Sequence, residues 1–316
     1  MRRRLVTVIV IGLLAAAAVY TLTRDEGSDS SDNSTSGDAT TVTTAARAAS
    51  TAPASTAATG KGTIGAVLGD GGETITIKTI HDGDSFIARL PDGEEVEVRL
   101  LGINAPDRFE CLHHEARKAL KALLESGPVT LHRDVSDRDR YGRLLRYVVV
   151  DGVVTNVALA EQGLAVAVST GPDDSRRAEI HAAQKRARAA GLGIWRRDAC
   201  GTPASTEVAI TRVESDPPGR DEANLNGEYA VIRNADRVPV DMSGWKLRDD
   251  STQNRYWFPK GFKLAAGAEV TVHVGSGDDT ATDLYWGRRY PVWDNFGDTA
   301  LLLDPSGNVV SYLDVS

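Results

Sequence analysis

Apolar and polar residues alternate in three short runs between residues 74 and 101, as they do in strands with one buried face, and two more β-prone runs follow by residue 150. A Pro-Asp-Gly sequence separates the second run from the third. It predicts a tight turn, because proline fixes φ and glycine accepts a positive φ. The five predicted strands cover residues 74–80, 85–90, 95–101, 129–133 and 144–150.

Between the third and fourth runs the period changes to that of a helix. Ala116, Leu120 and Leu124 fall on one helical face, and a Gly-Pro pair ends the pattern. Two more helices are predicted at residues 154–161 and 175–190, each followed by a glycine. Five strands with a helix between the third and fourth is the order of an OB fold. The pattern therefore predicts a five-stranded OB-fold barrel with about three helices.

After residue 206 the helical period disappears. Strand-like runs separated by Gly, Pro and Asn continue to the last residues, which is typical of a small antiparallel β-sandwich. Residues 201–206 are predicted to be a linker. The barrel domain is predicted at residues 67–200, and the sandwich domain at residues 207–316.

The first residues have the composition of a targeting segment. Three arginines precede an uncharged run at residues 5–22, which is at the lower limit for spanning a bilayer and long for a signal-peptide core. Residues 1–24 are predicted to be either a membrane anchor, with its N-terminus inside, or a cleaved signal peptide. Residues 25–66 are rich in Ser, Thr, Ala and Gly, and this composition predicts a disordered linker.

Charge limits how the chain can bind nucleic acid. The net charge of -8 argues against a protein that coats nucleic acid through overall positive charge. Residues 67–205 hold 19 basic and 21 acidic side chains, whereas residues 206–316 hold 11 and 18. Attraction to nucleic acid must therefore be local to a groove of the barrel domain. A basic run that includes Arg176, Arg188 and Arg197 is predicted to be a solvated helix face, and a non-specific track for nucleic acid is the alternative.

Three motifs in the barrel domain carry acidic oxygens and arginines. They are Asp82-Gly83-Asp84-Ser85, the sequence Arg-Leu-Leu-Gly-Ile-Asn-Ala-Pro-Asp at residues 99–107, and Tyr141-Gly142-Arg143. Carboxylates hold a hard cation through oxygen, and guanidinium groups bind phosphate oxygens in pairs. A carboxylate can also act as a general base toward water. Together these groups suffice for metal-assisted hydrolysis of a phosphodiester.

In these motifs, and in their order and spacing, the chain resembles the thermonuclease (staphylococcal nuclease) family. The resemblance extends to Gly193-Ile194-Trp195. It implies an OB-fold barrel that hydrolyses DNA and RNA with little sequence preference, leaving 5′-hydroxyl and 3′-phosphate ends. It also implies Ca²⁺ as the cofactor. The implied metal ligands are Asp84, Asn104 and Ala105, the implied catalytic residues are Arg99, Asp107 and Arg143, and Tyr141 is implied to bind substrate.

The chain departs from this family at identifiable positions. Asn104 stands where the family usually has Asp, so a weaker metal site is expected. Asp107 stands where the family usually has Glu, and its shorter side chain sets the carboxylate back by about 1 Å. Glu110 is the nearest substitute, but it is predicted to be a solvated loop acid. Val166 and Val168 lie where the family has paired tyrosines, so base stacking there is weak.

The chain has two cysteines, Cys111 and Cys200. In an exported protein an even pair predicts a disulfide, and two unpaired thiols are the alternative. Cys111 follows the Asp107 loop, and Cys200 follows the end of the barrel domain. The bond would therefore tie this loop to the domain's C-terminal end.

The second domain resembles a lamin tail domain, which is an immunoglobulin-like sandwich. The matching segments are residues 228–234, residues 240–249 and residues 297–304, and Ser243-Gly244-Trp245 is the most specific element. The resemblance implies a binding or docking module, without identifying its partner.

The sequence thus predicts a mostly β protein with helices, built from an OB-fold barrel and an immunoglobulin-like sandwich. We expect a monomeric, calcium-dependent nuclease that acts on DNA or RNA outside the cytoplasm, either anchored in the cell membrane or secreted. One alternative is a non-catalytic module that binds nucleic acid or protein on a nuclease-like fold. Another makes the sandwich the main functional unit and the barrel an adaptor.

Overall fold

The computed structural model describes residues 72–169, 171–204 and 206–315. The predicted targeting segment at residues 1–24 and the predicted linker at residues 25–66 lie outside the described residues. Within the described part of the chain, no helix is long and apolar enough to cross a membrane.

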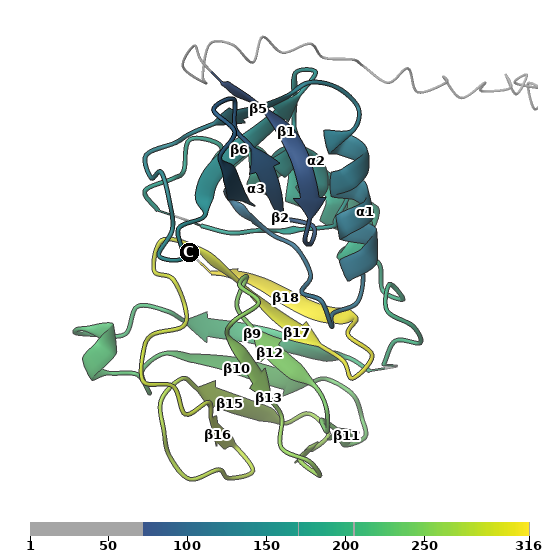
Figure 1. Ribbon diagram of the computed structural model, residues 1–316. Coiled ribbons are helices and arrows are strands. Elements are labelled where there is room, and N and C mark those ends of the chain that lie inside the picture. Colours follow the sequence, from purple (N-terminus) through teal and green to yellow (C-terminus); the bar gives the residue numbers. More distant parts are fainter. Residues whose placement is uncertain (1–71, 170, 205, 316) are drawn as a thin grey trace, which may run out of the picture. The chain divides into compact units, whose positions relative to one another are not determined.

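Among the described residues, five strands close into a barrel (Figure 1). Their order is β3-β2-β1-β5-β6, and parallel pairing of β3 with β6 closes the ring. Each predicted strand is confirmed to within one residue at either end. The strands are β1 (Glu73–Ile80), β2 (Ser85–Arg89), β3 (Glu95–Leu100), β5 (Val129–His132) and β6 (Leu144–Val150).

Three α-helices in this part of the described chain pack against the barrel, and all three were predicted. The first, α1, presents Ala116, Leu120 and Leu124 to the core, as the helical period requires. Short strands that the pattern did not predict precede each helix. The elements are β4 (Ile103–Asn104), α1 (His113–Leu124), β7 (Val153–Val154), α2 (Thr155–Glu161), β8 (Val166–Ala167), α3 (Arg177–Ala190) and the 3₁₀ turn η2 (Gly193–Trp195).

The barrel interior is filled by apolar side chains from the strands and from α1. Phe86, Val98, Leu100, Leu131 and Tyr147 are all fully or almost fully buried there. Burial of each such side chain contributes about 2 kcal/mol, so the barrel is a rigid support. The polar motifs lie where its strands end, in the turn from β1 to β2 and in the segment after β3.

The remaining described residues form a β-sandwich, as predicted. Trp245 and Trp293 are buried between its two four-stranded sheets. One sheet contains β9 (Val208–Glu214), β10 (Tyr229–Asn234), β15 (Glu269–His273) and β16 (Asp283–Tyr285). The other contains β12 (Lys246–Arg248), β13 (Arg255–Trp257), β17 (Asp298–Leu303) and β18 (Val309–Val315). The minor elements are η3 (Asp221–Ala223), β11 (Val240–Asp241) and β14 (Lys263–Leu264).

The predicted disulfide is confirmed. Cys111 and Cys200 are bonded, with their Cα atoms 5.6 Å apart. The sandwich packs on this bridge, because the Cys200 N–H donates to Asn308 Oδ1 at 2.7 Å and Gly307 lies beside both cysteines. All described residues belong to one compact unit, so the barrel and the sandwich are in contact.

The prediction of a wholly solvated basic run was wrong for two of its arginines. Arg176 is buried and donates to Glu179 Oε2 at 2.6 Å. Arg188 pairs with Asp314 of β18 at 2.8 Å, and its guanidinium lies 4.1 Å from the centre of the Tyr312 ring. Cation–π and ionic contacts to the sandwich therefore hold Arg188, which is unavailable as a nucleic-acid contact.

Candidate active site

Asp84 lies in the turn from β1 to β2, and the local sequence dictates its direction. Asp82 shapes the turn, since its Oδ1 accepts hydrogen bonds from the Asp84 N–H at 3.0 Å and from Ser85 Oγ at 2.8 Å. Only glycine fits at position 83, because a Cβ there would come within 2.7 Å of the Cβ atoms of Ala105 and Ala116. The turn therefore packs tightly on α1, with Asp84 directed inward.

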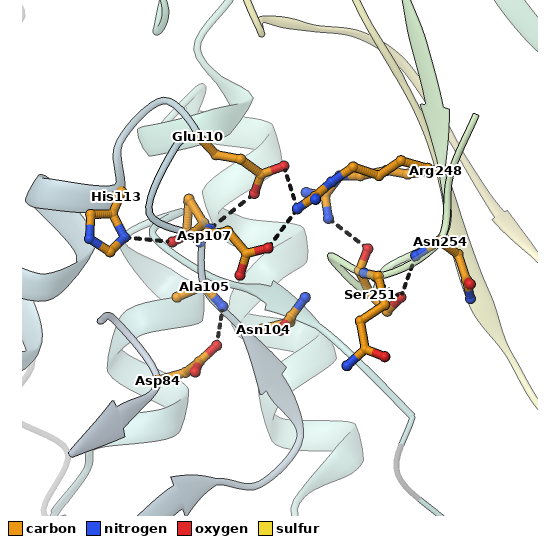
Figure 2. Close-up of polar contacts among 12 residues, drawn as sticks. Asp84, Asn104, Ala105, Asp107, Glu110, His113, Arg248, Ser251 and Asn254 are labelled. Carbon is orange, nitrogen blue, oxygen red and sulfur yellow. Dashed lines mark hydrogen bonds and ion pairs between the residues drawn. The ribbon is translucent and has the colours of Figure 1, made fainter. Parts of the chain in front are cut away.

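The carboxylate of Asp84 is held in a buried position. Its side chain accepts a hydrogen bond from the Ala105 N–H at 2.6 Å (Figure 2), and only 6% of the residue is exposed. Burial raises the pKa of the Asp84 carboxyl to about 7, against the opposing effect of the Arg99 guanidinium. A buried acid beside an arginine is costly to the fold, and such groups cluster at functional sites.

Arg99 brings the first two motifs together. It lies on β3, opposite Ser85 of β2, and its guanidinium is 3.4 Å from Asp84 Oδ2. It also donates to Asn104 Oδ1 at 3.0 Å. Arg99 thus contacts both Asp84 and Asn104, which brings the three predicted residues together at one end of the barrel.

The third motif contributes Arg143 to the same place. Asp139 shapes its turn, because the Asp139 carboxylate accepts bonds from the backbone N–H groups of Tyr141 and Arg143 and from Arg143 Nε at 2.7 Å. These bonds, with the charge of Arg143, hold the pKa of Asp139 below its usual value although burial opposes them. Tyr141 is 64% exposed and lies beside Arg143, with the guanidinium 5.6 Å from its ring centre.

Asp107 and Glu110 both contact an arginine of the sandwich. The Asp107 carboxylate accepts a bond from Arg255 of β13 at 2.6 Å, and Glu110 Oε1 is 3.1 Å from the same nitrogen (Figure 2). Glu110 also accepts from the Asp107 N–H at 3.0 Å. The prediction that Glu110 is a solvated loop acid was therefore wrong, because an arginine distant in sequence reaches it.

These residues surround a cavity of about 300 Å³. The sequence motifs identified one part of its lining, namely Asp82, Asp84, Arg99, Asn104, Asp107 and Arg143. They missed the other part, which is the sandwich loop Asp250, Ser251, Thr252 and Gln253. Ala105 is buried behind Asp84, and Tyr141 is outside the residues that line the cavity.

The sandwich loop is fixed from within and docked on the site. Arg248 donates to the Ser251 carbonyl at 3.0 Å, and the Asp250 N–H donates to Asp298 Oδ1 at 3.1 Å. Across the domains, Asn104 Nδ2 donates to the Asp250 carbonyl at 3.2 Å. Burial raises the pKa of Asp249 to about 7 and that of Asp250 well above its usual value, so this loop adds acidic groups beside the cavity.

The oxygens around the cavity suit a hard cation better than a soft one. Within the described residues, no group of three or more His, Cys, Asp or Glu side chains could hold a metal ion. Of the predicted ligands, Asp84 and Asn104 line the cavity and could offer a carboxylate and an amide oxygen, which are donors that calcium accepts, whereas Ala105 is not among the lining residues.

Comparison with known proteins identifies both domains. Residues 97–197 match the family model described as Staphylococcal nuclease homologue, and residues 201–316 match that of the Lamin Tail Domain.

Individual relatives match the barrel. The chain is 36% identical over 132 residues to the "Thermonuclease" of Staphylococcus intermedius, which covers 40% of this chain and 78% of that protein. It is 31% identical over 129 residues to the "Thermonuclease" of Staphylococcus hyicus, covering 39% of this chain and 76% of that protein. It is 33% identical over 129 residues to "Endonuclease YncB" of Bacillus subtilis (strain 168), covering 38% of this chain and 61% of that protein. The chain therefore belongs to the thermonuclease family, as a nuclease whose barrel is followed by a lamin tail domain.

Proposed function

We propose that this nuclease depends on calcium and cleaves DNA and RNA outside the cytoplasm, with little sequence preference. The observation that carries the proposal is the convergence of Asp84, Arg99, Asn104 and Arg143 on one cavity at the end of a rigid barrel. Attack of water on the phosphorus would release the 5′-oxygen, leaving a 5′-hydroxyl and a 3′-phosphate.

Asp84, Asn104 and Ala105 would hold the calcium ion, which would neutralise charge on the phosphate when bound. Asn104 supplies an oxygen but no charge. The backbone carbonyl of Asp250 lies beside it from the sandwich, so the oxygens near the cavity do not come from the barrel alone. The Arg99 guanidinium lies 3.4 Å from Asp84 Oδ2 and 3.0 Å from Asn104 Oδ1, so both oxygens are within reach of one positive group.

Arg99 and Arg143 would stabilise the negative charge that gathers on the phosphate oxygens in the transition state. Each is preorganised by a neighbouring carboxylate, Arg99 by Asp84 and Arg143 by Asp139. Asp107 would accept a proton from the attacking water. Arg255 contacts its Oδ2 atom, and among the described residues no hydrogen bond to Oδ1 is present, so Oδ1 is the oxygen available for this step.

Two independent features support a location outside the cytoplasm. Residues 1–24 have the pattern of an anchor or signal peptide, and the Cys111–Cys200 bond belongs to an oxidising compartment. Alkylation of the protein in intact cells, before any reduction, tests the second feature. Modification of both thiols would place the protein in a reducing compartment instead.

Hydrolysis of single-stranded DNA and of RNA by the full-length protein, across a calcium titration and with EDTA, tests the activity. We expect calcium-dependent cleavage whose products are labelled by polynucleotide kinase without prior dephosphorylation. Arg99→Ala and Arg143→Ala should each lower the rate by about 10² or more, whereas Arg133→Ala, an exposed arginine away from the cavity, should not. Absence of hydrolysis at every calcium concentration would refute the proposal.

A further inference from the structure

A second groove, of about 720 Å³, adjoins the catalytic cavity. Asp82 and Asp107 line both spaces, so the two lie next to each other, on either side of these residues. A polymer whose reacting phosphate lies in the cavity can therefore continue into this groove. We call it the Phe109 groove and define it by His81, Arg108, Phe109, His114 and Arg117.

Two arginines give the Phe109 groove positive charge. Arg108 and Arg117 are exposed, and neither takes part in an ion pair among the described residues. Arg117 Nε donates to the Ile80 carbonyl at 2.9 Å, which fixes the side chain while its terminal nitrogens make no hydrogen bond within the described chain. Guanidinium groups without a carboxylate partner suit phosphate oxygens.

The two acids of the groove form no ion pair with Arg108 or Arg117 among the described residues. Asp107 shares Arg255 with Glu110, at 2.6 and 3.1 Å. Asp82 directs Oδ1 into its own turn, toward Ser85 and the Asp84 N–H. Arg108 and Arg117 thus present guanidinium groups without an ion-pair partner among the described residues, on a chain whose net charge is -8, and such groups are where a polyanion can be held locally.

Phe109 is presented at the tip of a fixed turn. It is 95% exposed, and the Arg108 guanidinium lies 5.8 Å from its ring centre. The turn is closed by the Glu110 N–H, which donates to the Asp107 carbonyl at 2.8 Å. Arg255 holds its two acidic ends, and the Cys111 disulfide follows directly. An exposed aromatic ring on a held turn, beside unpaired arginines, is an arrangement on which unpaired bases can stack.

We propose that the Phe109 groove is a binding subsite for the nucleic-acid strand that extends from the catalytic cavity. Arg108 and Arg117 bind its phosphates, and Phe109 stacks on an unpaired base. The ligand is the phosphodiester backbone with an exposed base, so single-stranded nucleic acid is favoured over a duplex. This inference rests on the proposed function for the position of the reacting phosphate.

Binding measured without hydrolysis tests the subsite. The full-length protein is titrated, in EDTA, into a fluorescently labelled single strand of about ten nucleotides, and anisotropy is recorded at several salt concentrations. Phe109→Ala should weaken binding about tenfold, whereas Phe296→Ala, which removes an 83% exposed phenylalanine of the sandwich, should not. Arg117→Gln should reduce the salt slope by about 0.7, and Lys118→Gln, the next exposed cation on α1, should leave it unchanged.

A kinetic comparison separates a subsite from a disturbance of Asp107. With calcium, Phe109→Ala and Arg117→Gln should raise KM for the long strand about tenfold while kcat stays within about twofold. A dinucleotide, which has only one nucleoside on each side of the reacting phosphate and no further strand to bind, should be cleaved with unchanged kcat/KM. Equal losses for both substrates, or wild-type affinity of both variants for the strand, would overturn the proposal. Binding by the wild-type protein without cleavage at any calcium concentration would refute the proposed activity and leave the subsite standing.

Discussion

Replacing Asp84 by Asn should stabilise the protein in EDTA at neutral pH while abolishing activity. The carboxyl of Asp84 is buried, and burial raises its pKa to about 7 from a usual value of 3.8. In the unfolded chain this group ionises at its usual pKa, so above pH 7 folding must bury a charge that water would otherwise solvate. Asn has a similar shape, and its Oδ1 can still accept the hydrogen bond from the Ala105 N–H.

The sign of the pH dependence follows from the two pKa values. Between pH 3.8 and about 7 the folded state binds more protons at Asp84 than the unfolded state, so stability falls as the pH rises. A difference of about three pKa units corresponds to about 4 kcal/mol. The variant should therefore exceed the wild type by about 4 kcal/mol near pH 8, and by little near pH 4. Other buried acids, such as Asp249, titrate in both proteins and cancel in the difference.

Urea unfolding followed by tryptophan fluorescence, with EDTA at several pH values, measures this difference. Glu115→Gln, which changes an exposed acid of α1, is the matched control and should show no such pH dependence. Calcium added near pH 8 should raise the stability of the wild type but not of Asp84→Asn, because only a protein that binds the ion gains from it. If Asp84→Asn destabilises the protein equally at every pH, the carboxylate serves the fold rather than a cation.

Three further predictions concern the contacts around the site. Asn104→Asp should lower the calcium concentration for half-maximal activity several-fold. It should also lower the free energy of unfolding in urea by about 1–2 kcal/mol, because its carboxylate would face the Asp250 carbonyl. An unchanged calcium requirement would exclude Asn104 as a ligand. Arg255→Gln should lower kcat about tenfold at saturating calcium, because it releases Asp107. The free energy of unfolding should change by less than about 1 kcal/mol. An unaltered kcat would show that Asp107 needs no support from the sandwich. Cys111→Ser should lower the free energy of unfolding by about 4–5 kcal/mol in the chain-entropy model, because the disulfide joins two residues that are 89 positions apart in the sequence. A variant as stable as the oxidised wild type would contradict this.

The barrel and its motifs were readable from the sequence because their determinants are local. Alternation places apolar side chains inward along each strand, and the Asp84 turn contains the glycine and the capping acid that shape it. The motifs lie at strand ends, so closing the barrel brings Asp84 and Arg99 together without further information. The buried tryptophans of the sandwich follow the same logic.

What the sequence did not reveal depends on how the two domains meet. Nothing near Glu110 indicates an arginine partner, because Arg255 lies on a strand of the other domain. Arg188 likewise has the spacing of a solvated helix residue, and only the packing of β18 buries it. The loop that completes the catalytic cavity carries no motif, and its Asp250 is 146 positions from its partner Asn104. Periodicity and turn chemistry report local preferences, so contacts of this kind escape them.

Two of the departures from the thermonuclease pattern, Asn104 and Asp107, coincide with places that the sandwich touches. An amide at position 104 can donate to the Asp250 carbonyl, whereas an ionised Asp would be repelled by it. The acid at position 107 meets Arg255, and the bridge at Cys111 is covered by the turn that carries Asn308. These contacts fall within one segment of the barrel, between its third strand and α1. The lamin tail domain thus supplies both direct contacts to this segment and part of the lining of the cavity.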